Sequence, residues 1–173
     1  MAEEGRASGE LAGWKRDRGR TLERIEQLKR EGVCYICHDL ETGTVFGQQD
    51  VIYEDDLFRV VLDAFPRVEG HTIVVYKPHR DDISHLSEEE AGTVFAMCVR
   101  VVKAIKEGLG AEKVYLLTMC DGQINHLNFQ LLPRYAGNVM GYRRLSMERR
   151  ALADGEEAAE AIRAALEADQ GPA

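Results

Sequence analysis

Two short segments of this sequence carry side chains whose types and spacing could do chemistry. The first is the run His-Leu-Asn-Phe-Gln from His126 to Gln130. If this run forms a strand, His126, Asn128 and Gln130 project from one face, because alternate side chains of a strand share a face. The apolar residues between them then face the core. A half-buried strand with a polar outer face explains the row as well, although such a face more often carries Lys, Glu and Thr.

The second segment is Cys34-x-x-Cys37, which fits one half of a tetrahedral zinc site. The pair alone is also compatible with redox chemistry or with two buried thiols. Zinc needs two further ligands, and the natural candidates are His79, at a predicted strand end, and His126. Thiolate and imidazole together suit this metal. His85 is an alternative to His79.

A third candidate is Asp63, which ends the apolar run that begins at Phe58. A carboxylate in this place can accept two hydrogen bonds from a vicinal diol, such as the diol of a ribose. A carboxylate that closes a turn is the simpler interpretation of this residue taken alone.

Composition limits the class of protein. The sequence has 173 residues, 22 Lys and Arg against 30 Asp and Glu, a net charge of -8 and 45% hydrophobic residues. This length predicts one compact domain with terminal additions. The acidic balance argues against a protein that binds a nucleic-acid backbone, but it does not exclude a single bound nucleotide. No apolar run approaches the ~20 residues that cross a bilayer, and the polar start lacks the apolar segment of a secretory signal. We therefore expect a soluble, cytoplasmic protein without nucleic-acid or membrane partners.

The remaining pattern predicts the scaffold that positions these residues. Five β-rich runs separated by turns cover residues 51–56, 58–63, 71–79, 113–120 and 125–134. Short connections, with one helix between the third and fourth runs, indicate an α+β fold around an antiparallel sheet. An amphipathic helix is expected over residues 9–31, and an Ala/Glu-rich helix with a break near Gly155 is expected in the C-terminal region.

The helix between the third and fourth runs has recognisable ends. Ser87 followed by Glu90 is a capping box, and Gly108 and Gly110 are expected to stop the helix. Its apolar stripe is predicted to comprise Val94, Phe95, Cys98, Val101, Val102 and Ile105.

In their order and spacing, these segments resemble the histidine triad (HIT) superfamily, in particular its uridylyltransferase and dinucleoside polyphosphate phosphorylase branches. The matching pieces are Cys34-Tyr-Ile-Cys, residues 51–63, residues 70–79 and residues 126–134. The resemblance implies a HIT-like fold, with a five-stranded antiparallel sheet and flanking helices, that binds a nucleotide through its α-phosphate and pairs into a homodimer. The chain is then expected to divide into an N-terminal helical extension (1–33), a HIT-like nucleotide-binding domain (34–136) and a C-terminal loop and helix (137–173).

The resemblance also assigns roles along the His126 segment. In the family, the middle imidazole of a His-x-His-x-His motif attacks the α-phosphorus and forms a nucleotidyl-imidazole intermediate; Gln replaces the third His in the uridylyltransferase-like branch. Here His126 fills the first position and Gln130 the third, but the middle, nucleophile position is Asn128. A carboxamide nitrogen has a delocalised lone pair, so the covalent route should be disabled while phosphate binding is retained. An engineered His-to-Asn substitution and a natural nucleotide binder both explain Asn128, and the otherwise matching strand favours the substitution.

Other site residues follow from the same resemblance. The ligands implied for a structural zinc ion are Cys34, Cys37, His79 and His126. The implied nucleotide contacts are Asp63 for the ribose hydroxyls, Tyr35, Ile36 and Leu62 for the walls of the base site, Gln123 near the phosphate and His71 as a support of the triad.

Two function classes are therefore in competition. The first is a nucleotidyltransferase or phosphorylase, or else a hydrolase, that acts at the α-phosphate of a nucleotide such as a dinucleoside polyphosphate and is inactive in this chain because of Asn128. The alternative is a naturally inactive nucleotide-binding regulatory protein. A third possibility is a redox protein that uses Cys34 and Cys37.

Overall fold

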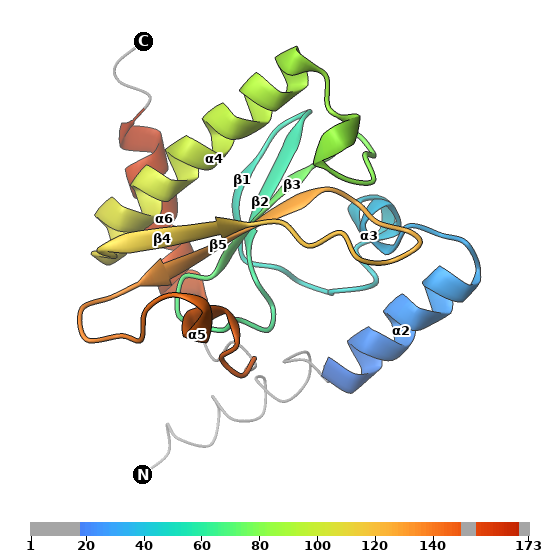
Figure 1. The fold of residues 1–173 in the computed structure, drawn as a ribbon, viewed down its shortest axis with the longest axis horizontal. Coiled ribbons are helices and arrows are strands. Elements are labelled where there is room, and N and C mark those ends of the chain that lie inside the picture. Colours follow the sequence, from blue (N-terminus) through green and yellow to red (C-terminus); the bar gives the residue numbers. More distant parts are fainter. Residues whose placement is uncertain (1–17, 150–154, 170–173) are drawn as a thin grey trace, which may run out of the picture.

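The computed structural model describes residues 18–149 and 155–169, and within them five antiparallel strands form one sheet in the order β1-β2-β3-β5-β4 (Figure 1). The strands are β1 (Val51–Glu54), β2 (Phe58–Leu62), β3 (Thr72–Tyr76), β4 (Lys113–Leu117) and β5 (Asn128–Arg134). All five predicted runs contain a strand, and the predicted α+β fold is confirmed. Strand β5 begins at Asn128, so His126 lies just before the strand rather than in it.

The helices of the described ranges flank this sheet. They are α2 (Arg18–Arg30), α3 (Tyr35–Thr42), the 3-10 turn η1 (Ile83–His85), α4 (Glu88–Leu109), the short α5 (Tyr142–Leu145) and α6 (Glu156–Ala168). The predicted N-terminal helix is thus present from Arg18 onward, and residues 9–17 of that prediction lie outside the described residues. None of the helices in the described part of the chain is long and apolar enough to span a bilayer.

The two faces of the sheet have different roles, because side chains alternate along each strand. Val60, Val74 and Phe129 point to the face covered by α4 and α6 and belong to the main hydrophobic core. Their neighbours Val61 and Ile73 line a cavity on the opposite face, where α2 and α3 lie. The sheet therefore separates a packed core from a hollow, and β5 contributes to both sides.

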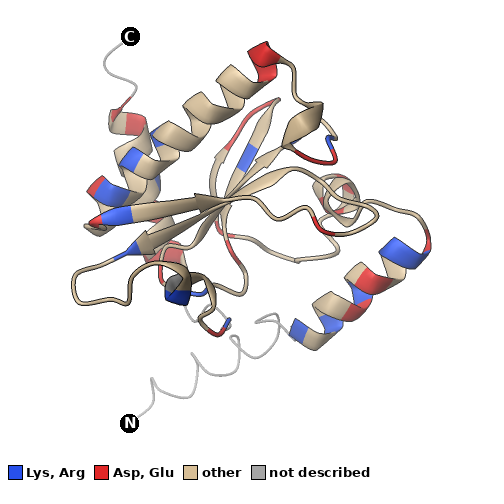
Figure 2. Ribbon diagram, viewed as in Figure 1, with Lys and Arg blue, Asp and Glu red and all other residues tan. Residues whose placement is uncertain are grey.

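Helix α4 begins as predicted. Ser87 Oγ accepts from Glu90 N at 3.2 Å and Glu90 Oε2 accepts from Ser87 N at 2.9 Å, which completes the capping box. Figure 2 shows the acidic first turn of α4, and Lys106 lies in its last turn, an arrangement that complements the helix macrodipole.

The predicted stripe of α4 is right in outline and wrong at one position. Its buried residues are Val94, Met97, Cys98, Val101, Ala104 and Ile105. Phe95, which was included in the stripe, is 52% exposed. It follows Val94 directly, and a step of one residue turns the side chain about 100° around the helix axis, away from the core.

Gly108 has a different role from the one predicted. Helix α4 runs through Gly108 to Leu109 and ends at Gly110, whose left-handed φ of 66° caps it. A Cβ at Gly108 would lie 2.5 Å from the backbone oxygen of Ala161 in α6. Gly108 is therefore not a stop signal but the point of close approach between the two helices, and Gly110 alone ends the helix.

The C-terminal helix belongs to the same core as the sheet. Residues of α6 that are buried in this core are Ala158, Ala159, Ile162, Ala165 and Leu166. The helix starts directly after Gly155, close to the predicted break, and packs against α4. The division at residue 136 stays a prediction, but α6 shares the hydrophobic core of the residues before that boundary.

Candidate functional site

The cavity on the α2/α3 face has a volume of about 340 Å³ and contains most of the predicted nucleotide contacts. Strands β2, β3 and β5 form its floor, and α2 and α3 form a largely apolar wall. The predicted site residues that line it are Tyr35, Ile36, Leu62, Asp63, Asn128 and Gln130. Tyr35 packs edge-to-face on Phe46, with ring centroids 6.2 Å apart. Burial, reinforced by Cys34, raises the pKa of the Tyr35 hydroxyl, which keeps this hydroxyl neutral.

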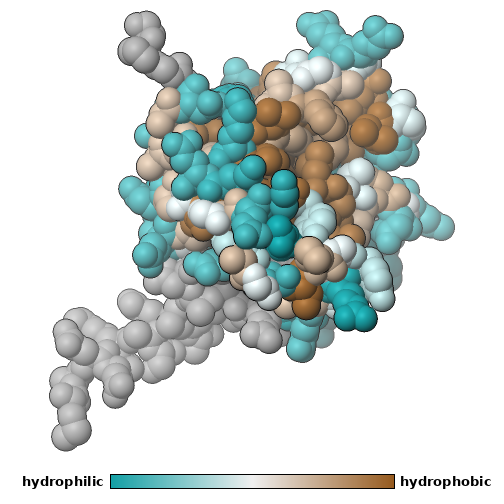
Figure 3. All heavy atoms as spheres, turned by 60° about the vertical axis from the view of Figure 1, so that its left-hand side comes forward, coloured by the Kyte–Doolittle hydropathy of each residue, from teal (hydrophilic) through white to brown (hydrophobic). Residues whose placement is uncertain are grey.

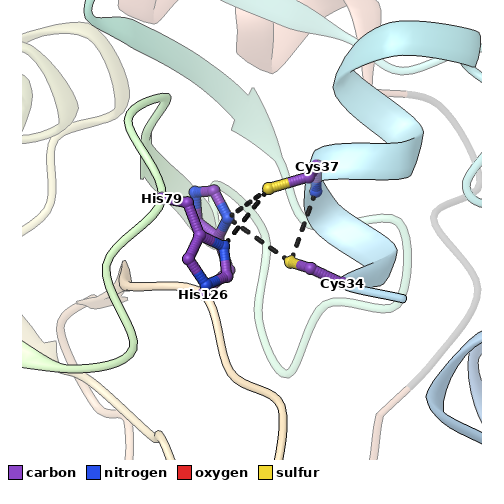
Figure 4. A group of neighbouring side chains, drawn as sticks. All are labelled: Cys34, Cys37, His79 and His126. Atoms are coloured by element: carbon purple, nitrogen blue, oxygen red, sulfur yellow. Dashed lines mark hydrogen bonds between the residues drawn. The ribbon is translucent and has the colours of Figure 1, made fainter. Parts of the chain in front are cut away.

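Beside the cavity, Cys34, Cys37, His79 and His126 converge (Figure 4), with one donor atom from each within 4.8 Å of all the others. Cys37 Sγ lies 3.3 Å from Nδ1 of both histidines, and Cys34 Sγ lies 3.5 Å from His126 Nδ1. In a tetrahedral site with Zn–S of about 2.3 Å and Zn–N of about 2.0–2.1 Å, sulfur and nitrogen are about 3.5 Å apart. The spacing of the four side chains therefore fits zinc, and the cluster could bind it.

Local structure explains how these ligands meet. Cys34 caps α3, with its Sγ accepting from Cys37 N at 3.5 Å, so the first turn of the helix places both thiols on one side. On the opposite side, Leu127 N donates to Arg80 O at 2.7 Å. This backbone bond ties the loop after β3 to the segment before β5, and it brings His79 beside His126, with ring centroids 5.2 Å apart.

Hydrogen bonds behind the histidines orient them for a metal. His126 Nε2 donates to Tyr76 O at 2.7 Å, which leaves Nδ1 unprotonated and directed at the sulfurs. His79 Nε2 lies 3.3 Å from Asp81 Oδ1, a carboxylate partner of the kind that accompanies zinc-bound imidazole. Both ring nitrogens of His126 are thus engaged, and neither faces a phosphate. With four protein ligands, such a site has no open catalytic position.

The alternatives raised for these residues fare differently. His85 lies in η1, where it pairs with Asp82 at 3.8 Å, and it is not part of the cluster. Redox use of the CxxC pair needs a lowered thiol pKa. Here burial, together with the Cys34 neighbour, raises the pKa of Cys37 to about 12. This shift is opposite to that of a reactive cysteine and disfavours the redox hypothesis.

Two carboxamides of β5 lie on the cavity floor. Asn128 and Gln130 are 9% and 8% exposed and pair across the sheet with Val75 and Ile73. Asn128 Nδ2 donates to His126 O at 2.9 Å, so the amide is fixed by the residue that also belongs to the cluster. The predicted alternation along this strand is present, since Phe129 lies in the core on the other face.

Asp63 lies near Gln130 on the floor, and His71 lies behind it. Asp63 Oδ1 accepts from Phe65 N at 2.9 Å, and Oδ2 lies 3.3 Å from Nδ1 of His71. His71 is completely buried behind the cavity and does not line it. Burial lowers the pKa of His71 to about 4, although the Asp63 carboxylate opposes the shift. Its imidazole is therefore a neutral support at ordinary pH.

Arg149 is a site residue that the sequence interpretation missed. Its NH1 donates to Asp63 Oδ2 at 2.5 Å and to Phe65 O at 3.0 Å, and its NH2 donates to Gln130 Oε1 at 3.2 Å. The backbone near it is held by Arg67, whose NH1 donates to Met147 O at 2.6 Å. Arg149 follows the sheet by 15 residues and belongs to no motif, so its only signal in the sequence is a basic residue after the last strand.

Gln123 is, like His71, a predicted site residue that does not line the cavity. Asn125 closes a tight turn with Gly122 through two hydrogen bonds of 2.8 and 2.9 Å, and Gln123 is exposed on this turn. The residues of this segment that line the cavity are Met119 and Asp121.

Comparisons with known proteins identify the family. The HIT domain family matches residues 47–136, just over half of the chain, and the protein therefore belongs to the HIT family. That superfamily is nucleotide-binding and nucleotidyl-transferring. An uncharacterized HIT-like protein of Methanocaldococcus jannaschii is 29% identical over 92 residues, which cover 51% of this chain and 70% of that protein.

Solved structures agree with this assignment. A zinc-bound histidine triad family protein from Mycobacterium smegmatis has a TM-score of 0.65 at 27% identity, covering 80% of this chain and 97% of that one. A uridylyltransferase structure also has a TM-score of 0.65, but at 17% identity. The matched region covers 50% of that uridylyltransferase chain. The second likeness shows the shared fold alone.

Proposed function

We propose that this protein binds a nucleotide in the cavity and that the site is built for nucleotidyl transfer at the α-phosphate, with the nucleophile position held by Asn128. One observation carries the proposal: a carboxylate, Asp63, and two carboxamides, Asn128 and Gln130, lie along one floor under an apolar wall. Asp63 suits ribose hydroxyls, Tyr35, Ile36 and Leu62 suit a base, and the carboxamide N–H groups suit phosphate oxygens.

Asn128 is also placed where an imidazole could act. Its Nδ2 donates to His126 O, and the Nδ1–H of a histidine at the same position could donate to the same carbonyl. The imidazole Nε2 would then carry the lone pair. In the transfer, this nitrogen forms a bond to the α-phosphorus while the anhydride P–O bond breaks and the remaining phosphates leave. An acceptor oxygen then forms the new P–O bond and releases the imidazole.

The acceptor is proposed to be orthophosphate or another phosphorylated group, and the substrate a dinucleoside polyphosphate or similar anhydride. Gln130 supports this choice because its amide can orient the α-phosphate without titrating. The zinc ion is proposed to be structural: it would join α3 to the segment before β5 and fix Asn128 through the His126 carbonyl.

The alternative is a nucleotide-binding regulatory protein without chemistry. The hydrogen bond from Asn128 to His126 O favours it, since the amide is well accommodated as it stands. Under either explanation of Asn128, an engineered substitution or a natural residue, the present chain binds without transferring.

The test is to measure nucleotide release from a dinucleoside polyphosphate, with and without orthophosphate, in the Asn128→His variant. We expect release to rise at least about a hundredfold above that of the Asn128 protein and to require orthophosphate. Asn128→Gln, which keeps a carboxamide, is the matched control and should stay inactive. Release that is indifferent to orthophosphate would contradict the phosphorylase assignment. No release from the His variant, with nucleotide binding intact, would favour the regulatory alternative.

A homodimer is proposed as the working assembly. On α4, Val94 and Val101 are buried in the core of one chain and are not available for pairing. Other apolar side chains are exposed on the same side, on α4 and on the edge strand β4: Phe95, Val99 and Leu116. Figure 3 shows apolar residues gathered across the middle and upper right of the face it presents. Size-exclusion chromatography with light scattering should give twice the mass of one chain. A clean monomer would contradict this proposal.

A further inference from the structure

Apart from its arginines, the proposed nucleotide site has donors for phosphate but no positive charge to balance it. Asn128 and Gln130 are neutral, and the His71 imidazole is held neutral by burial. A zinc ion with two thiolates and two neutral imidazoles has no net charge. A bound phosphate would therefore bring one or two negative charges into a half-enclosed cavity without a partner, which is unfavourable.

Arg149 supplies the missing cation. The cavity lining contains three guanidinium groups, from Arg18, Arg59 and Arg149. Arg59 is paired with Glu54 at 3.0 Å. Arg149 is the one whose guanidinium joins Asp63 Oδ2 to Gln130 Oε1 on the floor of the cavity. It lies between the carboxylate assigned to ribose and the amide assigned to phosphate.

Gln130 is oriented by this contact. Its Oε1 accepts from Arg149 NH2, so its Nε2, the donor end of the amide, is directed away from the guanidinium. An anion near Gln130 would receive N–H donors from the amide and from Arg149. Guanidinium groups bind phosphate oxygens through two parallel hydrogen bonds, which makes Arg better suited to this task than Lys.

The contact with Asp63 implies an exchange. A ribose diol needs the Asp63 oxygens as acceptors, and Oδ2 is occupied by Arg149 in this structure. A nucleoside that takes Oδ2 from the guanidinium removes this carboxylate partner of Arg149 and leaves it the neutral acceptors Phe65 O and Gln130 Oε1. A nucleotide brings its own phosphate for the guanidinium. The ion pair with Asp63 therefore discriminates against nucleosides and in favour of 5′-phosphorylated ligands.

We propose that Arg149, delivered by the segment between α5 and α6, is the phosphate-binding and specificity-determining residue of the cavity, and that it exchanges Asp63 for the ligand's phosphate. This inference rests on the proposed function, since it takes the cavity to be a nucleotide site. Arg67 assists by holding the backbone of this segment at Met147. The ligands selected are nucleoside 5′-monophosphates and polyphosphates.

The experiment is calorimetric titration of the zinc-loaded full chain with nucleoside 5′-monophosphates and with the corresponding nucleosides, for adenine, guanine and uracil. Arg149→Gln should weaken monophosphate binding about tenfold to a hundredfold. Nucleoside binding should not weaken, because Asp63 is released. The monophosphate affinity of Arg149→Lys should lie between those of the unsubstituted chain and Arg149→Gln, since lysine keeps the charge and loses the paired donors. Rising ionic strength should weaken monophosphate binding less in Arg149→Gln than in the unsubstituted chain.

The matched control is Arg143→Gln, which removes the same charge from an exposed position of α5. It should bind every probe as the unsubstituted chain does. Zinc content and the urea midpoint of each variant establish that the fold is retained. If Arg149→Gln binds monophosphates as tightly as the unsubstituted chain, or more tightly, Arg149 is not the phosphate ligand and this inference alone is overturned. If the unsubstituted chain binds none of the probes, the proposed function itself is wrong.

Discussion

The two terminal regions of the described chain are attached to the same sheet by different kinds of interaction. The N-terminal region (18–49) is joined through Cys34 and Cys37, which meet His79 and His126 in a cluster that could bind zinc. The C-terminal region (137–169) is joined by hydrophobic packing of α6 and by the hydrogen bonds of Arg149. The first attachment depends on four side chains that could share one metal ion, whereas the second is spread over a helix face and one ion pair. The two should therefore respond differently to mutation.

The largest effect is expected from removal of one zinc ligand. In Cys37→Ser, the zinc content should fall from about one ion per chain to well below that, and the free energy of unfolding should fall by about 3 kcal/mol or more, because metal binding contributes directly to folding. Metal analysis and urea unfolding check the two parts. Cys120→Ser is the matched control, since Cys120 is a free thiol outside the cluster, and it should keep its zinc. Full zinc occupancy in Cys37→Ser would contradict the assigned ligand set.

The features that could be predicted from the sequence are those with a local signal. The strands, the capping box and the four cluster residues each have a local signal: alternation, a Ser-x-x-Glu spacing, or a residue type with specific chemistry. Asn128 and Gln130 were predictable as cavity residues for the same reason, because they alternate with Phe129 on one strand.

Arg149 and Gly108 could not be predicted in this way, because their roles depend on long-range contacts. Arg149 meets Asp63 across 86 positions of sequence, and nothing in its own neighbourhood encodes that meeting. Gly108 has the composition signal of a helix end, and only the position of Ala161 shows that it is a contact point. Phe95 was misplaced for a related reason: the stripe of α4 is set by where α6 packs, not by its own apolar residues alone.

The next largest effect is a dependence of the folding stability on pH, through His71 beside Asp63. The pKa of His71 falls from 6.5 to about 4 on folding, chiefly through burial. Between these pH values the unfolded chain binds a proton that the folded chain does not, so stability falls as pH falls from 6.5 through 4. The contribution is up to about 3 kcal/mol, fully present above pH 6.5.

Urea unfolding at pH values from 7.5 to 4, at saturating zinc, tests this linkage in the unsubstituted chain and in His71→Asn. The variant keeps an acceptor near Arg67 N, which donates to His71 Nδ1 at 3.3 Å, and it cannot titrate in this range. We expect the two stability curves to converge as the pH falls. Parallel curves would mean that folding leaves the pKa of His71 unchanged, and would remove its role as a neutral support of Asp63.

The smallest effect tests the hydrophobic packing of α6 on α4. It compares a Gly→Ala substitution at two positions of α4. A Cβ at Gly108 would lie 2.5 Å from Ala161 O, and backbone cannot move aside as a flexible side chain can, so Gly108→Ala should destabilise the fold by about 1–3 kcal/mol. Gly92 is in the same helix, and a Cβ there meets nothing within 4 Å. Gly92→Ala should instead stabilise by about 0.5–1 kcal/mol, because alanine has the higher helix propensity. Urea midpoints that shift in opposite directions would show that α6 is held by close packing on α4. If both variants gain stability, α6 can withdraw from Gly108 at little cost, and the C-terminal region is attached mainly through Arg149.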